Sequence, residues 1–140
     1  ERLQQVITNL VHNAIKFTPI KGEVVVSATV AAHGQIPAPH APEATENNQP
    51  STRVSGHWPV VIIKVTDTGI GIPEDALPDL FQEFFRAKNA RQVKESGTGL
   101  GLSIAQSLIN RHDGVIECSS KPGRTVFRIL LPLEKMNGEE

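Results

Sequence analysis

The sequence predicts a two-layer α/β sandwich in which a mixed, mostly antiparallel sheet carries helices on one face. Segments with helical periodicity and segments rich in β-branched residues follow one another in the order α-β-β-α-α-β-β. The strands therefore come in pairs, which favours antiparallel neighbours and helices gathered on one side. A doubly wound parallel fold would instead alternate strand and helix regularly.

The first helix is expected over residues 1–17, where apolar side chains recur at the spacing of one buried face. That face consists of Leu3, Val6, Ile7, Leu10, Val11, Ala14 and Ile15. Asn9, Asn13 and Lys16 lie just off it, although asparagine is a poor helix residue because its amide competes for backbone hydrogen bonds. Two asparagines one turn apart therefore need an explanation other than helix formation.

Two strands are expected at 22–32 and 58–69, and the segment 33–57 between them is predicted to be a long, mobile, proline-rich insertion. This segment has four prolines and no periodicity, a composition that cannot offset the entropy lost on ordering. Its three histidines lack the spacing of metal ligands, so we interpret them as solvated loop residues.

A second helix is expected over 73–85, because Pro73 and the two acidic residues after it form a start signal. Its apolar stripe consists of Leu77, Leu80, Phe81 and Phe84. The next segment, 86–97, is polar and carries four basic side chains.

A third helix is expected over 98–114, with His112 as a capping residue and Gly114 as its stop. Its inward-pointing residues are predicted to be Leu100, Ile104, Leu108 and Ile109. The segments 115–120 and 124–133 alternate in polarity and are expected to pair as antiparallel strands around the turn Lys121-Pro122-Gly123.

The bulk composition indicates one soluble domain over residues 1–140. About 39% of the residues are apolar, which is enough for one core, and the net charge of −1 argues against binding to nucleic acid or to a membrane surface. The single cysteine, Cys118, cannot form an internal disulfide and fits a cytoplasmic location. We see no signal peptide or apolar span, and a chain that starts inside a helix is expected to be a piece of a longer protein.

The run "DTGIGIP" at 67–73 is the first candidate for chemistry. Asp67 is expected at a strand end, and Gly69 and Gly71 permit backbone geometry that a Cβ would forbid. Such a carboxylate can accept a hydrogen bond from an amine in a shallow slot, with Ile70 and Ile72 as apolar walls. The alternative is a tight connection between a strand and a helix, with no ligand.

The run "SGTGLGL" at 96–102 is the second candidate, because glycines alternate with other residues immediately before a helix. Several backbone N–H groups and the positive end of the helix could converge there on an anion. The run lacks the lysine of a Walker loop and the spacing and preceding strand of a dinucleotide fingerprint.

The polar edge of the first helix is the third candidate. At about 100° per residue, Asn9, Asn13 and Lys16 fall within about 60° of one another, with Phe17 beside them. An amide oxygen suits Mg²⁺, a lysine suits phosphate, and a ring offers a face to a base. The alternative is that both asparagines lie on a solvated flank.

Four motifs in order, "NLVHNAIKFT", "DTGIGIP", "FQEFF" and "GTGLGL", resemble the N, G1, F and G2 boxes of the catalytic ATP-binding domain of sensor histidine kinases. This domain belongs to the GHKL superfamily and has the Bergerat fold. The resemblance implies that Asn13 binds Mg²⁺, that Asn9 and Lys16 meet phosphate, and that Phe17 packs on adenine.

The same resemblance implies that Asp67 accepts a hydrogen bond from the adenine amino group, and that 86–97 is a mobile ATP lid. The ATP-binding residues that it assigns beyond the first helix are Asp67, Gly69, Ile70, Gly71, Ile72, Gly97, Thr98, Gly99, Leu100, Gly101, Leu102 and Thr125. Thr125 resembles a polar residue that reaches the adenine-binding aspartate, although "KPGRTVF" lacks the second glycine that many relatives have.

The position of Asn9 bears on the reaction. Hydrolytic relatives have a glutamate there that activates water, and asparagine cannot act as a general base. The resemblance therefore implies transfer of phosphate from ATP–Mg²⁺ to a histidine on a separate dimerisation domain, which is missing here, and then to a response regulator receiver domain. A degenerate nucleotide-binding module and an anti-sigma-factor-type serine kinase on the same fold remain alternatives.

Overall fold

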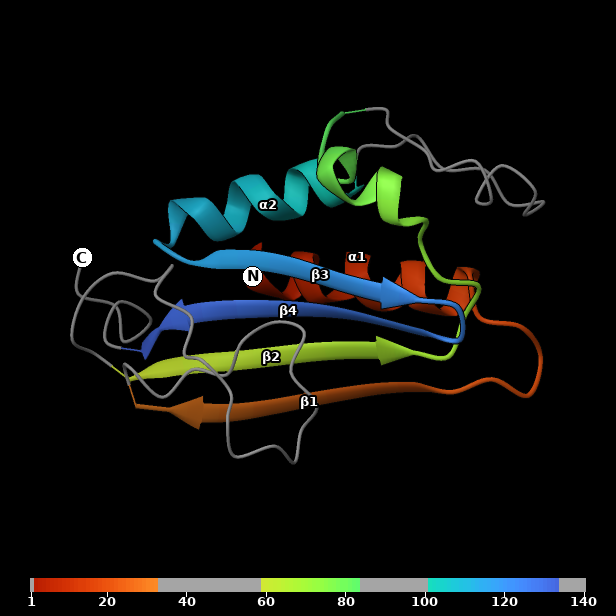
Figure 1. Ribbon diagram of the computed structural model, residues 1–140. Coiled ribbons are helices and arrows are strands. Elements are labelled where there is room, and N and C mark those ends of the chain that lie inside the picture. Colours follow the sequence, from red (N-terminus) through yellow and green to blue (C-terminus); the bar gives the residue numbers. More distant parts are fainter. Residues whose placement is uncertain (1, 33–58, 84–100, 134–140) are drawn as a thin grey trace.

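One antiparallel sheet organises the computed structural model, which describes residues 2–32, 59–83 and 101–133. Its strands are β1 (Val24–Ala31), β2 (Val60–Asp67), β3 (Val115–Lys121) and β4 (Arg124–Pro132), in the spatial order β1-β2-β4-β3. Each neighbouring pair is antiparallel. The helices α1 (Arg2–Lys16) and α2 (Gly101–Arg111) pack against one side of this sheet (Figure 1). The predicted two-layer α/β sandwich is confirmed.

The register of the strands decides which residues share an end of the sheet. Val24 on β1 and Thr125 on β4 both lie opposite Asp67, the last residue of β2. At the other end, Ala31 on β1 lies opposite Val60, the first residue of β2. The prediction of a hairpin-like pair is confirmed, whereas the predicted mobile insertion, 33–57, falls outside the described residues.

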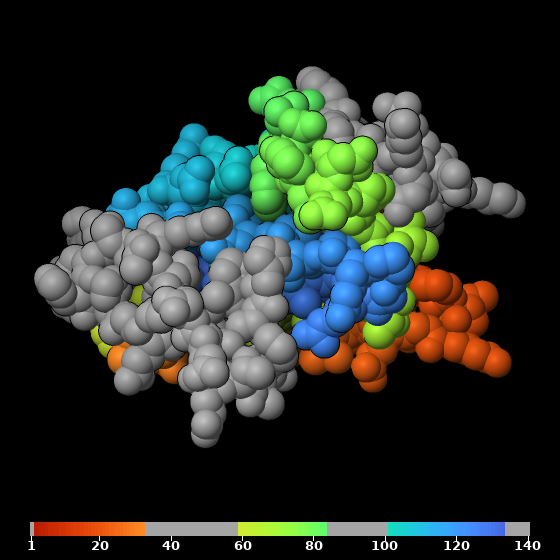
Figure 2. Space-filling view, viewed as in Figure 1, coloured from red at the N-terminus to blue at the C-terminus, as the bar shows by residue number. Residues whose placement is uncertain are grey.

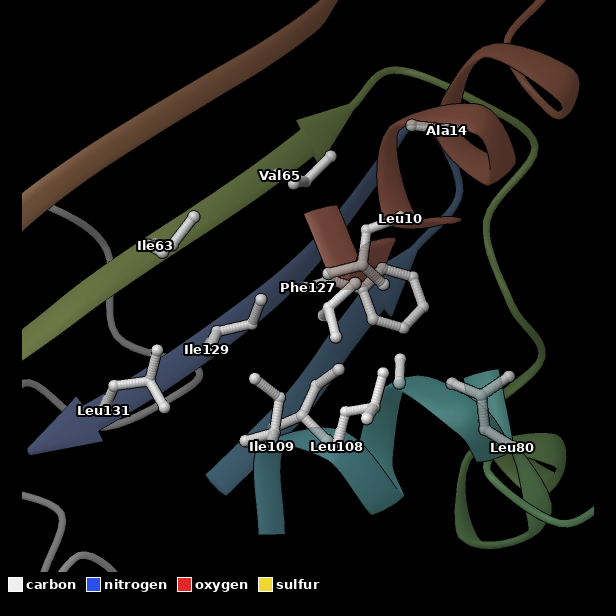
Figure 3. Close-up of a cluster of buried hydrophobic side chains, with 13 residues drawn as sticks. Leu10, Ala14, Ile63, Val65, Leu80, Leu108, Ile109, Phe127, Ile129 and Leu131 are labelled. Carbon is white, nitrogen blue, oxygen red and sulfur yellow. The ribbon is translucent and has the colours of Figure 1, made fainter. Parts of the chain in front are cut away.

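The main core lies between the sheet and the helices (Figure 3). Val6, Leu10 and Ala14 come from α1 at the i, i+4, i+8 spacing, and the side chains of Val6 and Leu10 are fully buried. The sheet and α2 contribute Ile63, Val65, Ala105, Leu108, Ile109, Ile116, Phe127, Ile129 and Leu131. Burying each large aliphatic side chain is worth about 1.5–3 kcal/mol, so this layer accounts for most of the packing that orders α1.

Two side chains that we predicted to be buried are exposed. Ile15 is 61% exposed and Ile104 is 39% exposed. At about 100° per residue, Ile15 lies roughly 140° around α1 from Leu10, and Ile104 lies roughly 140° around α2 from Ile109. Both predictions were wrong because the apolar stripe of each helix is wider than the strip that contacts the rest of the core.

The helix predicted over 73–85 is also wrong in type and length. The structure has a short 3₁₀ helix, η1 (Glu74–Asp79), with Pro78 inside it. Proline has no N–H to donate and its ring clashes with the preceding turn, so a longer α-helix is disfavoured here. Leu77, Leu80 and Phe81 still pack against the core, and the Phe81 ring meets the Phe127 ring edge-on at 6.3 Å between centroids.

The end of α2 follows the prediction. The helix ends at Arg111, and the Gly114 N–H donates to the Ile109 carbonyl at 3.0 Å. The His112 Nδ1 lies 2.8 Å from the Leu108 carbonyl, so His112 is a capping residue as expected. The turn Lys121-Pro122-Gly123 joins β3 to β4, also as expected.

The face of the sheet that points away from the helices carries a buried ion pair. Glu117 on β3 and Arg128 on β4 are cross-strand partners, 4% and 5% exposed respectively. The Arg128 Nε and Nη2 atoms donate to Glu117 Oε1 at 2.9 and 2.6 Å. Val60, Ile62 and Leu130 form a small apolar cluster on the same face. Among the helices that the structure describes, none has the length and hydropathy to span a bilayer.

Candidate functional site

Three segments that are distant in sequence meet at the end of the sheet where β2 finishes. They are the end of α1 with the residues directly after it, the loop 68–73 that follows β2, and the turn between β3 and β4 (Figures 1 and 2). Two backbone hydrogen bonds tie them together. The Ile70 N–H donates to the Phe17 carbonyl at 3.2 Å, and the Gly123 N–H donates to the Gly69 carbonyl at 3.1 Å.

Asp67 is the buried carboxylate of this end. It is 5% exposed, and its Oδ1 accepts the Gly69 N–H at 2.8 Å. Burial raises the pKa of the Asp67 carboxyl above its ordinary value of 3.8, and the hydrogen bond from Gly69 opposes that shift. Within the described residues no hydrogen-bond partner is recorded for Oδ2. Oδ2 can therefore accept a hydrogen bond from a ligand.

Gly69 and Gly71 let the loop pass close to its neighbours. A Cβ on Gly69 would collide with the Phe17 carbonyl oxygen and would lie 2.7 Å from Asp67 Oδ1. Gly71 has φ +81°, and a Cβ there would lie 2.8 Å from the Lys121 carbonyl oxygen. Both positions thus require glycine, one because of close approach and the other also because of its backbone conformation.

The two isoleucines of the loop differ from each other. Ile70 is 40% exposed, so its side chain is available as an apolar wall of the predicted slot. Ile72 packs against the main core, and its backbone N–H donates to the Ser120 Oγ at 2.8 Å. Ile72 therefore holds this end of the loop against the core and against β3.

The polar edge of α1 reaches the start of α2. The Asn9 Nδ2 donates to the Gly101 carbonyl at 3.4 Å, and Asn13 is partly buried one turn further on. The Lys16 Nζ lies over the Phe17 ring, 5.3 Å from its centroid, as in a cation–π pair. Asn9, Lys16 and Phe17 thus form a continuous edge that ends beside the 68–73 loop.

The glycine-rich run is only partly described. A Cβ on Gly101 would meet no atom within 4 Å, and Leu102 packs against the main core. Gly97, Thr98, Gly99 and Leu100, together with the predicted lid at 86–97, lie outside the described residues.

Thr125 is placed opposite Asp67, as the sequence suggested, but its recorded partner is another hydroxyl. Thr125 is 4% exposed, and its Oγ1 lies 2.6 Å from the Ser120 Oγ. Sequence reasoning missed Ser120. The signal was present, because pairing around the turn Lys121-Pro122-Gly123 puts Ser120 directly across from Thr125 on the same face of the sheet.

Together these features define a class of protein: a two-layer α/β sandwich domain with a polar helix edge and a buried carboxylate at one end of its sheet. No cation pairs with that carboxylate among the described residues. The chain belongs to the histidine kinase-, DNA gyrase B- and HSP90-like ATPase family, whose model matches residues 1–135.

Relatives of this chain include sensor kinases. The chain is 33% identical over 134 residues to the autoinducer 2 sensor kinase/phosphatase LuxQ of Vibrio harveyi, an alignment that covers 95% of this chain and 13% of LuxQ. It is 34% identical over 138 residues to the sensor histidine kinase YkoH of Bacillus subtilis, covering 99% of this chain and 24% of YkoH. The chain thus spans less than a third of these relatives.

Solved structures agree with this assignment. The mycobacterial sensor histidine kinase MprB superposes with a TM-score of 0.67 at 26% identity, over 91% of this chain and 70% of that one. Full-length ShkA, solved in complex with AMPPNP, superposes with a TM-score of 0.63 at 26% identity, over 94% of this chain and 21% of that one. MprB is named a sensor histidine kinase, so the fold of this chain is also that of a domain in such a kinase.

Proposed function

We propose that this chain is the ATP–Mg²⁺-binding catalytic domain of a sensor histidine kinase, and that it presents the γ-phosphate of ATP to a histidine on a separate dimerisation domain. The family of the chain and the kinases among its relatives support this class of reaction. The complex of ShkA with AMPPNP supports a nucleotide as the ligand.

The observation that carries the proposal is the state of Asp67. Its Oδ1 accepts the Gly69 N–H, while Oδ2 has no recorded partner among the described residues. Adenine carries an exocyclic amine that can donate to this oxygen, whereas guanine carries a carbonyl at the same place, which cannot. In this proposal Ile70 and Phe17 contact the base from the loop and from the end of α1.

The polar edge of α1 is assigned to the phosphates. Asn9 contacts the first residue of α2, so its amide lies beside the helix start that the glycine-rich run precedes. Lys16 supplies a cation on the same edge. In this proposal Gly97, Thr98, Gly99, Leu100, Gly101 and Leu102 surround the phosphates.

Asn13 fits a magnesium ion by the chemistry of its side chain. Mg²⁺ prefers oxygen ligands and is often bound by few protein groups together with substrate phosphates. An amide oxygen on a partly buried helix edge, next to the phosphate-binding residues, meets that need. When bound, the ion would neutralise charge on the phosphates.

The residues of this chain suit transfer to an outside acceptor better than hydrolysis. Asn9 cannot take a proton from water, and Asp67 is assigned to the base end of the nucleotide. What the chain can do is bind, orient and partly neutralise the triphosphate, which is most of what phosphoryl transfer requires. The acceptor imidazole would come from the dimerisation domain of the parent kinase, and a response regulator receiver domain would take the phosphate next.

Binding is tested by calorimetry with Mg-ATP on the parent sequence, on Asn13→Ala and on a matched control. Asn110→Ala is that control, because Asn110 is exposed on α2 away from the polar edge of α1. We expect Asn13→Ala to bind at least about tenfold more weakly and to lose its dependence on Mg²⁺. Equal binding by all three proteins would remove Asn13 from the metal site.

Phosphate transfer is tested with radiolabelled ATP on this domain alone and on the full-length kinase that contains it. We expect acid-labile label on a histidine of the full-length protein and very slow phosphate release by the lone domain. Tight ATP binding without any label would favour the degenerate module, and label on a serine of a partner would favour the serine kinase. Brisk release of phosphate by the lone domain would make it an ATPase.

A further inference from the structure

We propose that Ser120 is a positioning residue that joins the 68–73 loop to the β3–β4 hairpin and directs the Thr125 hydroxyl toward Asp67, thereby sharpening the preference for adenine. The preference itself rests on the proposed function. The joining of the loop does not, because it follows from contacts within the chain.

The first contact of Ser120 fixes the far end of the loop. The Ile72 N–H donates to the Ser120 Oγ at 2.8 Å. The near end is fixed by the Gly69 N–H on Asp67 Oδ1 and by the Gly123 N–H on the Gly69 carbonyl. Ile70, which would contact the base, lies between these two anchors. Loss of the Ser120 contact would therefore free the segment that faces the ligand.

The second contact of Ser120 determines where the hydroxyl proton of Thr125 points. The Ser120 and Thr125 hydroxyl oxygens are 2.6 Å apart, and a hydroxyl has one proton to donate. If Ser120 donates to Thr125, the Thr125 proton is left for its cross-strand partner Asp67 or for a bound base. In the reverse arrangement the Ser120 proton has no recorded acceptor in the described part of the chain. No acceptor for the Thr125 proton is recorded there either. We infer the first arrangement because Thr125 faces a carboxylate, Asp67, on the neighbouring strand, whereas Ser120 faces only Thr125.

The neighbouring serine provides a matched control. Ser119 precedes Ser120 on β3, so its side chain points to the opposite face of the sheet. Within the described ranges no hydrogen bond of its side chain is recorded. Replacing either serine by alanine removes the same atoms from the same strand, and only Ser120→Ala removes the two contacts.

The first measurement needs no nucleotide. Amide hydrogen exchange of Ile72 is compared in the parent protein, Ser120→Ala and Ser119→Ala. We expect exchange to be roughly fivefold faster in Ser120→Ala and unchanged in Ser119→Ala, since one hydrogen bond is lost. Ser120→Thr retains the hydroxyl and should restore the protection. Equal exchange in both alanine variants would overturn the joining role.

The second measurement is the ratio of the affinities for ADP and GDP. We expect Ser120→Ala to bind ADP roughly fivefold more weakly and GDP as before, so that the ratio falls. A purely structural role would instead weaken both nucleotides equally, and that outcome would overturn the proposal. If the parent protein binds neither nucleotide, the proposed function fails while the exchange of Ile72 still decides the role of Ser120.

A further variant covers the case in which Ser120→Ala does not fold. Thr125→Val keeps the shape of the side chain and removes the hydroxyl that Ser120 faces. We expect it to leave the exchange of Ile72 unchanged and to lower the ratio of ADP to GDP affinity. An unchanged ratio in this variant would contradict the second contact.

Discussion

Two buried carboxylates lie on opposite faces of the same sheet and have different surroundings. Glu117, in the middle of β3 on the face away from the helices, receives both Nε and Nη2 of Arg128. Asp67, at the end of β2 on the face toward the helices, receives one backbone N–H, and no cation pairs with it within the described residues. Their exposures are nearly equal, at 4% and 5%.

The difference separates stability from binding. A buried charge is costly unless a counter-charge and hydrogen bonds surround it, and Glu117 has both. Asp67 has one backbone hydrogen bond and no counter-charge among the described residues, so burial destabilises its ionised form in the free protein. A site that is left incomplete in this way can be completed by a ligand, whereas a satisfied pair such as Glu117–Arg128 has little left to offer one.

The largest expected effect is on the paired carboxylate. Arg128→Met should lower the free energy of unfolding by about 3–5 kcal/mol, because it removes the guanidinium that donates to the buried Glu117 carboxylate. Urea unfolding followed by circular dichroism measures this. The double variant Glu117→Leu with Arg128→Met should recover most of the loss, and a double variant as unstable as the single one would contradict the explanation.

The next effect is on Asp67 and concerns binding. Asp67→Asn should weaken ADP binding by about 1–3 kcal/mol, since an acceptor of the buried amine is lost or misoriented. It should not lower the free energy of unfolding at neutral pH, because it removes a destabilised charge. Asp75→Asn, an exposed change in η1, is the control for both measurements. A large loss of stability in Asp67→Asn would show that Asp67 is as structural as Glu117.

A smaller effect is the pH dependence of stability. The pKa of Asp67 is raised in the folded state, so the folded protein binds this proton more tightly than the unfolded chain. The resulting stabilisation is fully present below the ordinary pKa of 3.8 and is lost as the pH rises through the folded pKa. The parent protein should therefore lose stability relative to Asp67→Asn between about pH 4 and neutral pH. A gap that stays constant across this range in urea titrations would exclude the shift.

The smallest effect is that of the Asp67 charge on the neighbouring thiol of Cys118. Burial, and to a lesser extent the charge of Asp67, raises the pKa of Cys118 to about 12. The folded protein should therefore react with a thiol reagent about a thousandfold more slowly than the urea-unfolded chain at the same pH. Asp67→Asn should speed the folded reaction only a few-fold, and Asp75→Asn should not. Cys118 is the only cysteine of the sequence, so the signal is unambiguous. The same rate in all folded variants would show that the charge of Asp67 does not reach the thiol.

Local chemistry in the sequence was enough to predict the strands, the two helices and the carboxylate at a strand end. β-Branched runs and a clear proline-glycine turn leave few alternatives for the sheet. The helix predicted over 73–85 failed because an apolar stripe was given more weight than Pro78. Ile15 and Ile104 failed because periodicity identifies the apolar side of a helix and not the width of its contact.

The polar partners were harder to predict because they depend on register. Ser120 with Thr125 and Glu117 with Arg128 are both cross-strand pairs around one turn, so the correct register around Lys121-Pro122-Gly123 yields both. Sequence alone does not say which facing pairs are buried, and burial strengthens the hydrogen bonds within such a pair. The contact between Asn9 and Gly101 depends on the packing of α1 against α2 and has no local signal.

The pairing of Ala31 with Val60 also has a consequence for protein engineering. The chain leaves β1 at Ala31 and enters β2 at Val60, and these two residues face each other across neighbouring strands. Any sequence placed between them therefore starts and ends at nearly the same point. The entropy of closing such a loop grows slowly, by about 0.6 kcal/mol for each doubling of its length. Strands of eight residues separate this point from Asp67 by about 25 Å. A fluorescent protein or an affinity tag could be grafted there at little thermodynamic cost and at a distance from Asp67.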